Sequence, residues 1–333
     1  MQTKRKWFCS MMVVCVLASS AAAASEQLIP LGIPVGVRMT ADGAVISAMM
    51  DVDSPAGKIC PGKIAGLECG DIVQTVNDIP VSSGDQLAHI VQKSEGKPVK
   101  ISGIREKTDI SVTVQPVKST VTATYQIGIL VRDSMAGIGT LTYADPETRE
   151  FGALGHPISD VDSGALLPLN SGSLVPAGVV RVVAGKTGKP GELIGTYDFS
   201  REIGTLKKNT SCGVFGQLTD ESIYGKKQYL DIAEPSEITA GKAEILTCVQ
   251  GDTPEQYDIV IEKTDARASN GRNMKIRVTD AELLQKTGGI VPGMSGSPII
   301  QNGKLVGAVT HVLVNDPTRG YGIFIENMLE AAA

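Results

Sequence analysis

The sequence has 333 residues, which is long enough for two ordinary domains after any targeting segment is removed. Its 37 glycines, 17 prolines and short runs of Val, Ile and Thr favour an all-β protein with many turns over a helical bundle. The net charge of −5 and the lack of a basic run beyond the N-terminus exclude a nucleic-acid-binding surface and polyanionic partners.

The first 24 residues have the layout of a secretory signal. Lys4-Arg5-Lys6 precede an apolar run from Trp7 to Leu17, and alanines 22–24 stand before Ser25, where cleavage requires small residues. The whole stretch is also nearly long enough to remain as a membrane anchor. We therefore expect residues 1–24 to be a signal peptide or an anchor, and the rest of the chain to be extracytoplasmic, either secreted or membrane-anchored.

Four cysteines follow this segment: Cys60, Cys69, Cys212 and Cys248. An even number in an exported protein permits one or two disulfides, but the spacing does not show the pairing. The spacing also lacks the close pairs of a structural zinc site, and the three histidines are dispersed. We expect no metal site and no cofactor.

A first domain is expected over residues 29–118, with short strands and one amphipathic helix, 83–92, that begins at a serine cap. Six of its segments resemble a PDZ domain of the bacterial secreted type: Val35-Gly36-Val37, Ser54-Pro55-Ala56, Ala65-Gly66-Leu67, Gly70-Asp71-Ile72-Val73, Val76-Asn77-Asp78 and Gly96-Lys97-Pro98-Val99. The Gly57–Lys63 stretch departs from that pattern, because Cys60 and Pro61 interrupt what is usually a short helix.

PDZ domains bind an extended peptide as an added strand and capture its terminal carboxylate with a loop of backbone amides. The resemblance implies that this loop is formed by Leu31, Gly32, Ile33, Val35 and Gly36. Pro34 removes one amide donor from the loop and so weakens carboxylate capture. The alternative is a PDZ fold that packs against its neighbour without binding a free peptide.

Residues 120–333 are expected to form a larger β domain that contains a serine between glycines, Gly293-Met294-Ser295-Gly296. The turn can aim the amides of Gly293 and Ser295 at one point, as an oxyanion hole requires. Asn302-Gly303 follows as a strong hairpin signal. His156 lies on a loop at a strand end, where it can reach such a serine as a general base. This pattern indicates a serine peptidase.

Further segments carry a more specific resemblance: Gly152–Asp160, Val278-Thr279-Asp280, Thr287–Val291, Gly293–Pro298, Thr310-His311-Val312 and Asn315-Asp316-Pro317. They are similar to the stage IV sporulation protein B (SpoIVB) serine peptidases. The resemblance implies a mainly β protein in which a membrane signal and a PDZ domain, β-rich with short helices, precede a chymotrypsin-like double β-barrel peptidase domain.

The same resemblance implies Ser295 as nucleophile, His156 as general base and Asp280 as the acid that orients the imidazole. Asp280 stands only 15 residues before Ser295, whereas the acid of chymotrypsin-like enzymes lies far upstream. Three other aspartates therefore stay open as the acid: Asp160, Asp162 and Asp198. His311 is a candidate lining residue of the substrate cleft, with a core or surface position as the alternative.

The family further implies limited cleavage of a membrane-associated protein during endospore formation, in the space between the forespore and mother-cell membranes. The PDZ domain would select that partner, restrain the enzyme or direct self-cleavage. A non-catalytic PDZ adaptor on a degenerate peptidase scaffold is the alternative from another class, and the pairing of Ser295 with His156 counts against it. An α/β-hydrolase esterase fails because His156 precedes Ser295 in the chain.

Overall fold

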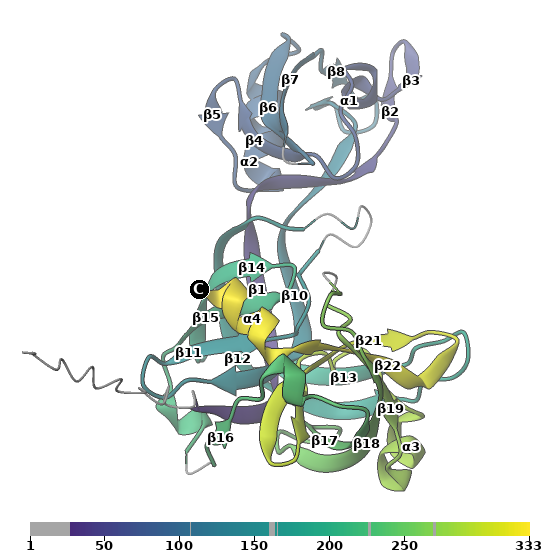
Figure 1. Cartoon of the computed structure of the whole chain (residues 1–333). Coiled ribbons are helices and arrows are strands. Elements are labelled where there is room, and N and C mark those ends of the chain that lie inside the picture. The colour runs from purple at the N-terminus through teal and green to yellow at the C-terminus, as the bar shows by residue number, and fades with distance from the viewer. Residues whose placement is uncertain (1–26, 107, 160–163, 165, 226–227, 269–270) are drawn as a thin grey trace, which may run out of the picture.

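The computed structural model describes residues 27–106, 108–159, 164, 166–225, 228–268 and 271–333, which form two β-barrels and a separate smaller lobe (Figure 1). The expected signal segment, 1–24, lies outside these residues. Within the described part of the chain, no helix is long and apolar enough to cross a membrane.

Six antiparallel strands form the first barrel. In order around it they are β1 (Gln27–Met49), β10 (Ile129–Ala144), β11 (Glu150–Ala153), β15 (Gly213–Leu218), β14 (Gly204–Thr210) and β12 (Leu169–Val183). The ring closes because β12 pairs with β1, with Val37 opposite Leu174. Buried aliphatic side chains and Phe151 fill its interior.

The second barrel is also closed and has six strands. They are β17 (Gly241–Thr247), β18 (Glu255–Thr264), β19 (Met274–Val278), β22 (Asp316–Phe324), β21 (Lys304–Leu313) and β20 (Pro298–Gln301). The expected hairpin turn is present, because Gln301 pairs with Lys304 and both Asn302 and Gly303 have positive φ angles of 53° and 76°.

Helix α3 (Ala281–Thr287) lies between β19 and the serine loop, and α4 (Ile325–Ala332) ends the chain. Ile325 and Met328 of α4 pack with Leu28 and Phe215 of the first barrel, so this helix helps to join the barrels. Four short elements connect the rest: β13 (Glu192–Tyr197), β16 (Leu230–Asp231) and the 3-10 turns η1 (Glu221–Ile223) and η2 (Pro235–Glu237).

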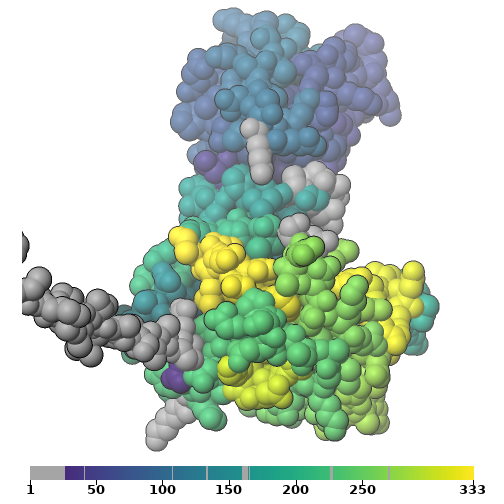
Figure 2. Space-filling view, in the orientation of Figure 1, coloured from purple at the N-terminus to yellow at the C-terminus, as the bar shows by residue number. Residues whose placement is uncertain are grey.

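The smaller lobe, which stands apart from the barrels in Figure 2, has the strand and helix content of a PDZ domain. Its strands are β2 (Val52–Ser54), β3 (Gly57–Ile59), β4 (Ile72–Val76), β5 (Ile79–Pro80), β6 (Val99–Arg105), β7 (Thr108–Val114), β8 (Val117–Lys118) and β9 (Tyr125–Gln126). Its helices are α1 (Pro61–Ile64) and α2 (Gly84–Lys93). The mainly β fold class, with a PDZ domain and a chymotrypsin-like double barrel, is confirmed.

The two helices of this lobe begin at residues that favour a helix start. The Ser83 side chain accepts a hydrogen bond from the Gln86 amide, so α2 begins at the expected cap. Pro61 does not interrupt a helix but occupies the first turn of α1, with Cys60 as the cap residue. This corrects our expectation, because proline at the first helical position loses no helical hydrogen bond.

Strands β1 and β10 are long enough to belong to both the PDZ lobe and the first barrel. They pair from Ile29↔Ala144 in the barrel to Met49↔Ile129 in the lobe, and β1 adds to the lobe's sheet through Ala44↔Val73. The lobe is therefore inserted between the first two strands of the barrel. A domain boundary at residue 29 therefore does not separate the PDZ lobe from the first barrel, because β1 belongs to both.

This pairing also corrects the expected carboxylate-binding loop at Leu31, Gly32, Ile33, Val35 and Gly36. These residues lie in β1, where Val35 pairs with both Gly139 and Pro176. Leu31 and Val35 are completely buried in the core of the first barrel. Val35 and Gly36 cannot meet a peptide terminus, because β1 is paired on both sides there, and Leu31 is closed off inside the barrel core.

Candidate active site

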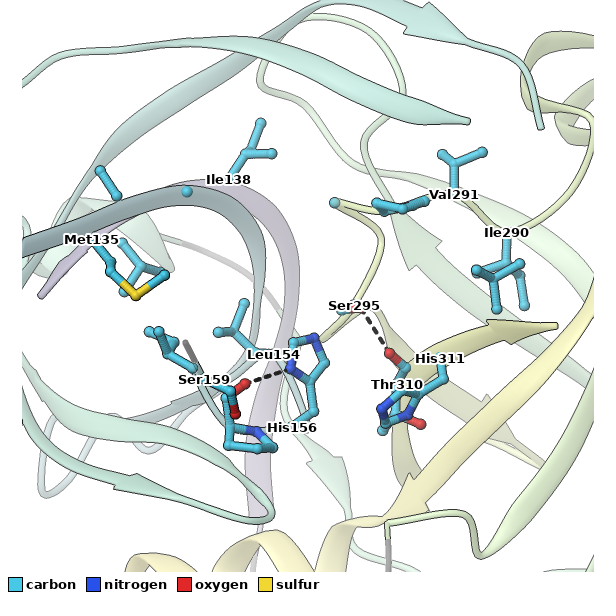
Figure 3. A pocket seen from close by; sticks show the side chains of 18 residues that line it. Met135, Ile138, Leu154, His156, Ser159, Ile290, Val291, Ser295, Thr310 and His311 are labelled. Atoms are coloured by element: carbon cyan, nitrogen blue, oxygen red, sulfur yellow. Dashed lines mark hydrogen bonds between the residues drawn. The ribbon is translucent and has the colours of Figure 1, made fainter. Parts of the chain in front are cut away.

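A cavity of about 540 Å³ lies between the two barrels (Figure 3). The first barrel lines it with Val37, residues 135–138 and residues 154, 156–159. The second barrel lines it with residues 290–293, Ser295 and residues 310–312. The structure therefore brings the predicted nucleophile and base, Ser295 and His156, to one cleft from different barrels.

The serine loop needs its glycines for conformation and for space. Gly293 and Gly296 have φ angles of 103° and 96°, which side-chain-bearing residues rarely adopt. A Cβ at Gly296 would stand 2.1 Å from the carbonyl oxygen of Thr140 in the first barrel. The backbone of the loop is thus pressed against the opposite barrel, and this contact fixes where Ser295 stands.

The Ser295 hydroxyl donates a hydrogen bond to the carbonyl oxygen of Thr310, at 2.8 Å (Figure 3). Thr310 lies in β21, the strand that returns after the hairpin. The Ser295 hydroxyl is therefore hydrogen-bonded to a backbone carbonyl of its own barrel.

The peptide planes of the loop place the predicted oxyanion donors. The carbonyl of Pro292 accepts from the Leu193 amide at 2.9 Å, and the carbonyl of Met294 accepts from the amide and hydroxyl of Ser297. In a trans peptide the N–H points opposite to the C=O, so the Gly293 and Ser295 amides point away from these partners. Within the described chain neither amide donates to a protein acceptor, which leaves both available to an oxyanion.

His156 follows β11 on a loop in which Leu154 and Gly155 both have φ angles of 69°. Its Nδ1 lies 2.8 Å from the carbonyl oxygen of Pro157. A carbonyl can only accept, so Nδ1 carries the proton and Nε2 keeps its lone pair, the form that a general base requires. Burial lowers the pKa of His156 below its usual 6.5, and the bond to Pro157 opposes that shift only in part.

A second imidazole, that of His311, lines the same cleft. Its ring centroid lies 5.5 Å from that of His156, with 44° between the planes (Figure 3). Its Nδ1 is buried and has no hydrogen-bond partner among the described residues. Burial, followed by the charges of His156 and Arg272, lowers the pKa of His311 to about 4. The cleft therefore holds His311 in its neutral form at pH 7.

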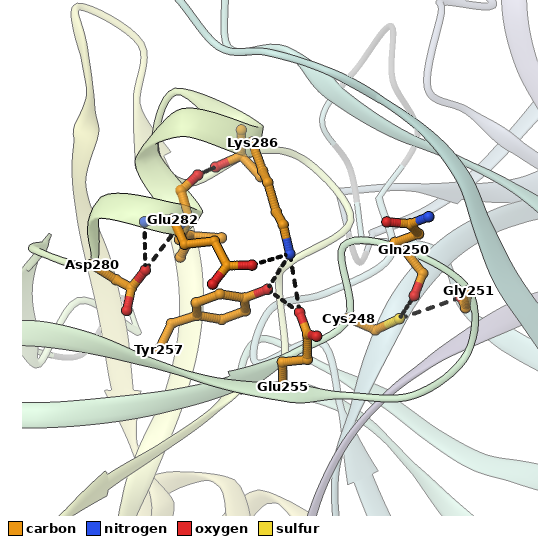
Figure 4. A network of polar contacts seen from close by, with 10 residues as sticks. Cys248, Gln250, Gly251, Glu255, Tyr257, Asp280, Glu282 and Lys286 are labelled. Carbon is orange, nitrogen blue, oxygen red and sulfur yellow. Dashed lines mark hydrogen bonds and ion pairs between the residues drawn. The ribbon is translucent and has the colours of Figure 1, made fainter.

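The structure does not bring the expected acid, Asp280, to this cleft. Asp280 caps α3, where its side chain accepts from the amides of Glu282 and Leu283 at 2.9 Å (Figure 4). Nearby, Lys286 pairs with Glu282 and Glu255 on the same outer face. The assignment of Asp280 as triad acid is wrong in this structure, because its Oδ1 caps α3, its Oδ2 accepts from the Asp258 amide at 3.5 Å, and the side chain does not line the cleft.

Within the described chain, none of the other candidate aspartates is placed as the acid that orients His156. Asp198 accepts from Ser200 on a separate loop and is not part of the cleft. Asp160 and Asp162 lie outside the described residues. Among the contacts that the described residues make, none joins a carboxylate to His156, so the group that orients this imidazole is the Pro157 carbonyl.

The four cysteines that follow residue 24 are free, and none is bonded to another. Cys60 is buried and its thiol donates to the Gly128 carbonyl, and the buried Cys248 donates to the Gln250 carbonyl (Figure 4). In the described part of the chain, no group of three or more His, Cys, Asp or Glu side chains is placed to hold a metal ion.

Comparison with known protein families identifies the family of this chain. The model of the SpoIVB peptidase S55 family matches residues 123–329, more than half of the chain. The chain belongs to the SpoIVB peptidase S55 family. It is thus a serine peptidase. Among curated proteins, no relative matches this chain.

Solved structures with similar parts have low identity to this S55 peptidase. The PDZ domain of an SdrC-like protein from Listeria monocytogenes is 19% identical over 28% of this chain and 90% of its own, with a TM-score of 0.23. The active form of the Rv3671c protease from M. tuberculosis is 15% identical over 60% and 75%, with a TM-score of 0.35. The HtrA-type protease AlgW with a decapeptide is 13% identical over 61% and 53%, also with a TM-score of 0.35.

Proposed function

We propose that this S55 peptidase is an exported endopeptidase that cuts a membrane-associated protein in a regulatory step of endospore formation. The observation that carries the catalytic part is one cleft that holds Ser295, a neutral His156 and two unpaired amides. The signal-like layout of residues 1–24 supports export. The sporulation role is proposed from the family name, and the space between the forespore and mother-cell membranes is proposed as the place of action.

In the proposed reaction, Ser295 Oγ leaves the Thr310 carbonyl and attacks the substrate carbonyl carbon while its proton passes to Nε2 of His156. The Gly293 and Ser295 amides bind the oxygen that becomes negative. His156 then gives its proton to the departing amine. A water molecule then attacks the acyl carbon while His156 takes the water's proton. His156 returns that proton to Ser295 Oγ as the bond between Oγ and the acyl carbon breaks, which releases the acid product.

The walls of the cleft indicate the side chain that it accepts. Ile138 and Leu154 on one barrel face Ile290 and Val312 on the other, and the lining described above contains no Asp, Glu, Lys or Arg. A charged side chain would lose its hydration there without gaining a partner, which costs free energy. Burial of an aliphatic side chain in the same cleft is favourable. We propose that a neutral, apolar residue precedes the cut bond.

The PDZ lobe is proposed to select the partner through a peptide segment. Between residues 129 and 131, strand β10 pairs with β1 on one side, and no other described strand pairs with it there. The start of helix α2 lies beside Val131 of the same strand. An added strand at this edge is the binding mode of the domain class. Recognition of the protein's own segments, with self-cleavage, is proposed as a second use of the same edge.

Activity-based labelling with a fluorophosphonate tests the proposal. We expect the probe to modify the wild-type protein at Ser295, as located by mass spectrometry, and to leave folded Ser295→Ala and His156→Ala variants unmodified. Folded wild-type protein that remains unlabelled would support the adaptor reading instead. Replacing the native gene with the Ser295→Ala allele in an endospore-forming host then tests the cellular role, because sporulation should stop although the protein is present.

A further inference from the structure

The strand that carries the PDZ lobe also holds the two catalytic loops together at one residue. Thr140 of β10 is 2% exposed and lies at the contact between the barrels. Its hydroxyl donates to the Gly293 carbonyl at 2.8 Å, and its amide donates to the Ser295 carbonyl at 3.0 Å. Its own carbonyl accepts from the Leu154 amide at 3.2 Å.

We propose that Thr140 is a positioning residue that sets the serine loop against the histidine loop. The inference rests on Ser295 and His156 being the nucleophile and base. One loop comes from the second barrel and the other from the first, so their spacing depends on contacts between barrels. Thr140 bonds the serine loop through two of its groups and the histidine loop, two residues before His156, through the third.

The hydroxyl bond acts on the part of the loop that forms the oxyanion hole. Gly293 has a φ of 103° and no side chain, so its two adjoining peptides can rotate unless their carbonyls are held. Leu193 holds the peptide before Gly293, which carries the Gly293 amide, and the peptide after it is held by the Thr140 hydroxyl and by the bond from the Met294 amide to the Val291 carbonyl. Loss of the Thr140 bond would loosen the turn between the Gly293 and Ser295 amides, and preorganised donors act only when they are fixed.

The same strand contains a matched position without this role. Thr142 lies two residues further along β10 and is completely buried. Its hydroxyl has no hydrogen-bond partner in the described structure. The hydroxyl of one buried threonine in this strand thus bonds the serine loop, and the hydroxyl of the other does not.

The test compares Thr140→Val with Thr140→Ser, and both with Thr142→Val, in the full-length protein. Valine keeps the shape of threonine and removes the hydroxyl, whereas serine keeps the hydroxyl. With a fluorophosphonate as the probe, we expect Thr140→Val to lower the maximal inactivation rate on the order of 10- to 100-fold with little change in the half-saturating probe concentration. Thr140→Ser and Thr142→Val should stay within about 3-fold of wild type on the same scale.

Equal rates for Thr140→Val and Thr142→Val would overturn the proposal, as would a loss in Thr140→Ser as large as that in Thr140→Val. If Thr140→Val does not fold, judged by its thermal unfolding, Thr140→Ala takes its place, since alanine keeps both backbone bonds without forcing a methyl against the Gly293 carbonyl. Absence of labelling in the wild type would instead count against the proposed function.

Discussion

The Ser295 hydroxyl is bonded to the carbonyl oxygen of Thr310 and not to the imidazole of His156. A carbonyl accepts this hydrogen bond but cannot remove the proton, so the serine must rotate about its Cα–Cβ bond before it reacts. The base meanwhile has its tautomer fixed by the Pro157 carbonyl. In this structure Ser295, the proposed nucleophile, is therefore in a resting position.

The labelling rate should depend on the protonation of His156. Only the neutral imidazole can accept the proton, and burial lowers its pKa, so the rate should rise with pH through a midpoint below 6.5. Measurement of fluorophosphonate labelling between pH 4 and 8 checks this, with His156→Ala as the background. A midpoint above 6.5 would contradict a carbonyl-oriented histidine, because a neighbouring carboxylate stabilises the imidazolium and raises its pKa.

Asp280 should tolerate asparagine but not alanine. Asparagine caps a helix as well as aspartate does, so Asp280→Asn should keep both stability and labelling rate, while Asp280→Ala should lose about 0.5–2 kcal/mol of unfolding free energy. Urea unfolding and probe kinetics on the two variants separate stability from activity. A fall on the order of 10⁴-fold in Asp280→Asn, as follows loss of the triad's charge, would restore Asp280 as the acid.

His311 should make the protein less stable in acid. Its folded-state pKa of about 4 lies below the unfolded value of 6.5, so the unfolded chain binds more protons between these values. The contribution of neutral His311 is complete above pH 6.5 and is lost as the pH falls toward 4. Thermal unfolding should show a smaller loss of Tm over this range in His311→Gln than in wild type. An unchanged pH dependence would show that His311 does not titrate as described.

Gly293 should not tolerate a side chain. A Cβ there would lie 2.9 Å from Cβ of Leu193, at a φ of 103°, so Gly293→Ala should disturb the oxyanion hole and lower the labelling rate on the order of 10²- to 10³-fold. Gly303→Ala is the control, because Gly303 also has a positive φ, 76°, but no atom lies near its Cβ position. Equal activity in the two variants would argue against the amide of Gly293 as a donor.

A charge in the cleft should change the preferred substrate. Val312 lines the cleft, whereas Val314 on the same hairpin is 47% exposed. We expect the wild type to cut peptide libraries after aliphatic residues and Val312→Glu to shift the preference toward Lys or Arg, since an unpaired buried carboxylate favours a basic partner. Val314→Glu should leave the profile unchanged. Cleavage without any apolar preference in the wild type would refute the assignment of the cleft.

The sequence by itself determined the features that depend on a few neighbouring residues. Ser83 caps α2, Asn302-Gly303 forms the hairpin turn, and glycines surround Ser295, because caps, turns and positive φ angles are set by local backbone chemistry. The segments quoted above were also enough to identify the peptidase family and the two residues, Ser295 and His156, that meet in the cleft.

Only the tertiary structure decided which strands pair and which distant residues meet. The apolar pattern of residues 29–40 fits a PDZ strand and a barrel strand equally well, and its burial between β10 and β12 comes from partners about 100 or more residues away. Asp280 fits both a helix cap and the acid that the family resemblance implies, and in the folded protein it is the helix cap. Thr140 and Leu193 carry no sequence signal, because their roles come from bonds to a loop that folds in the other barrel.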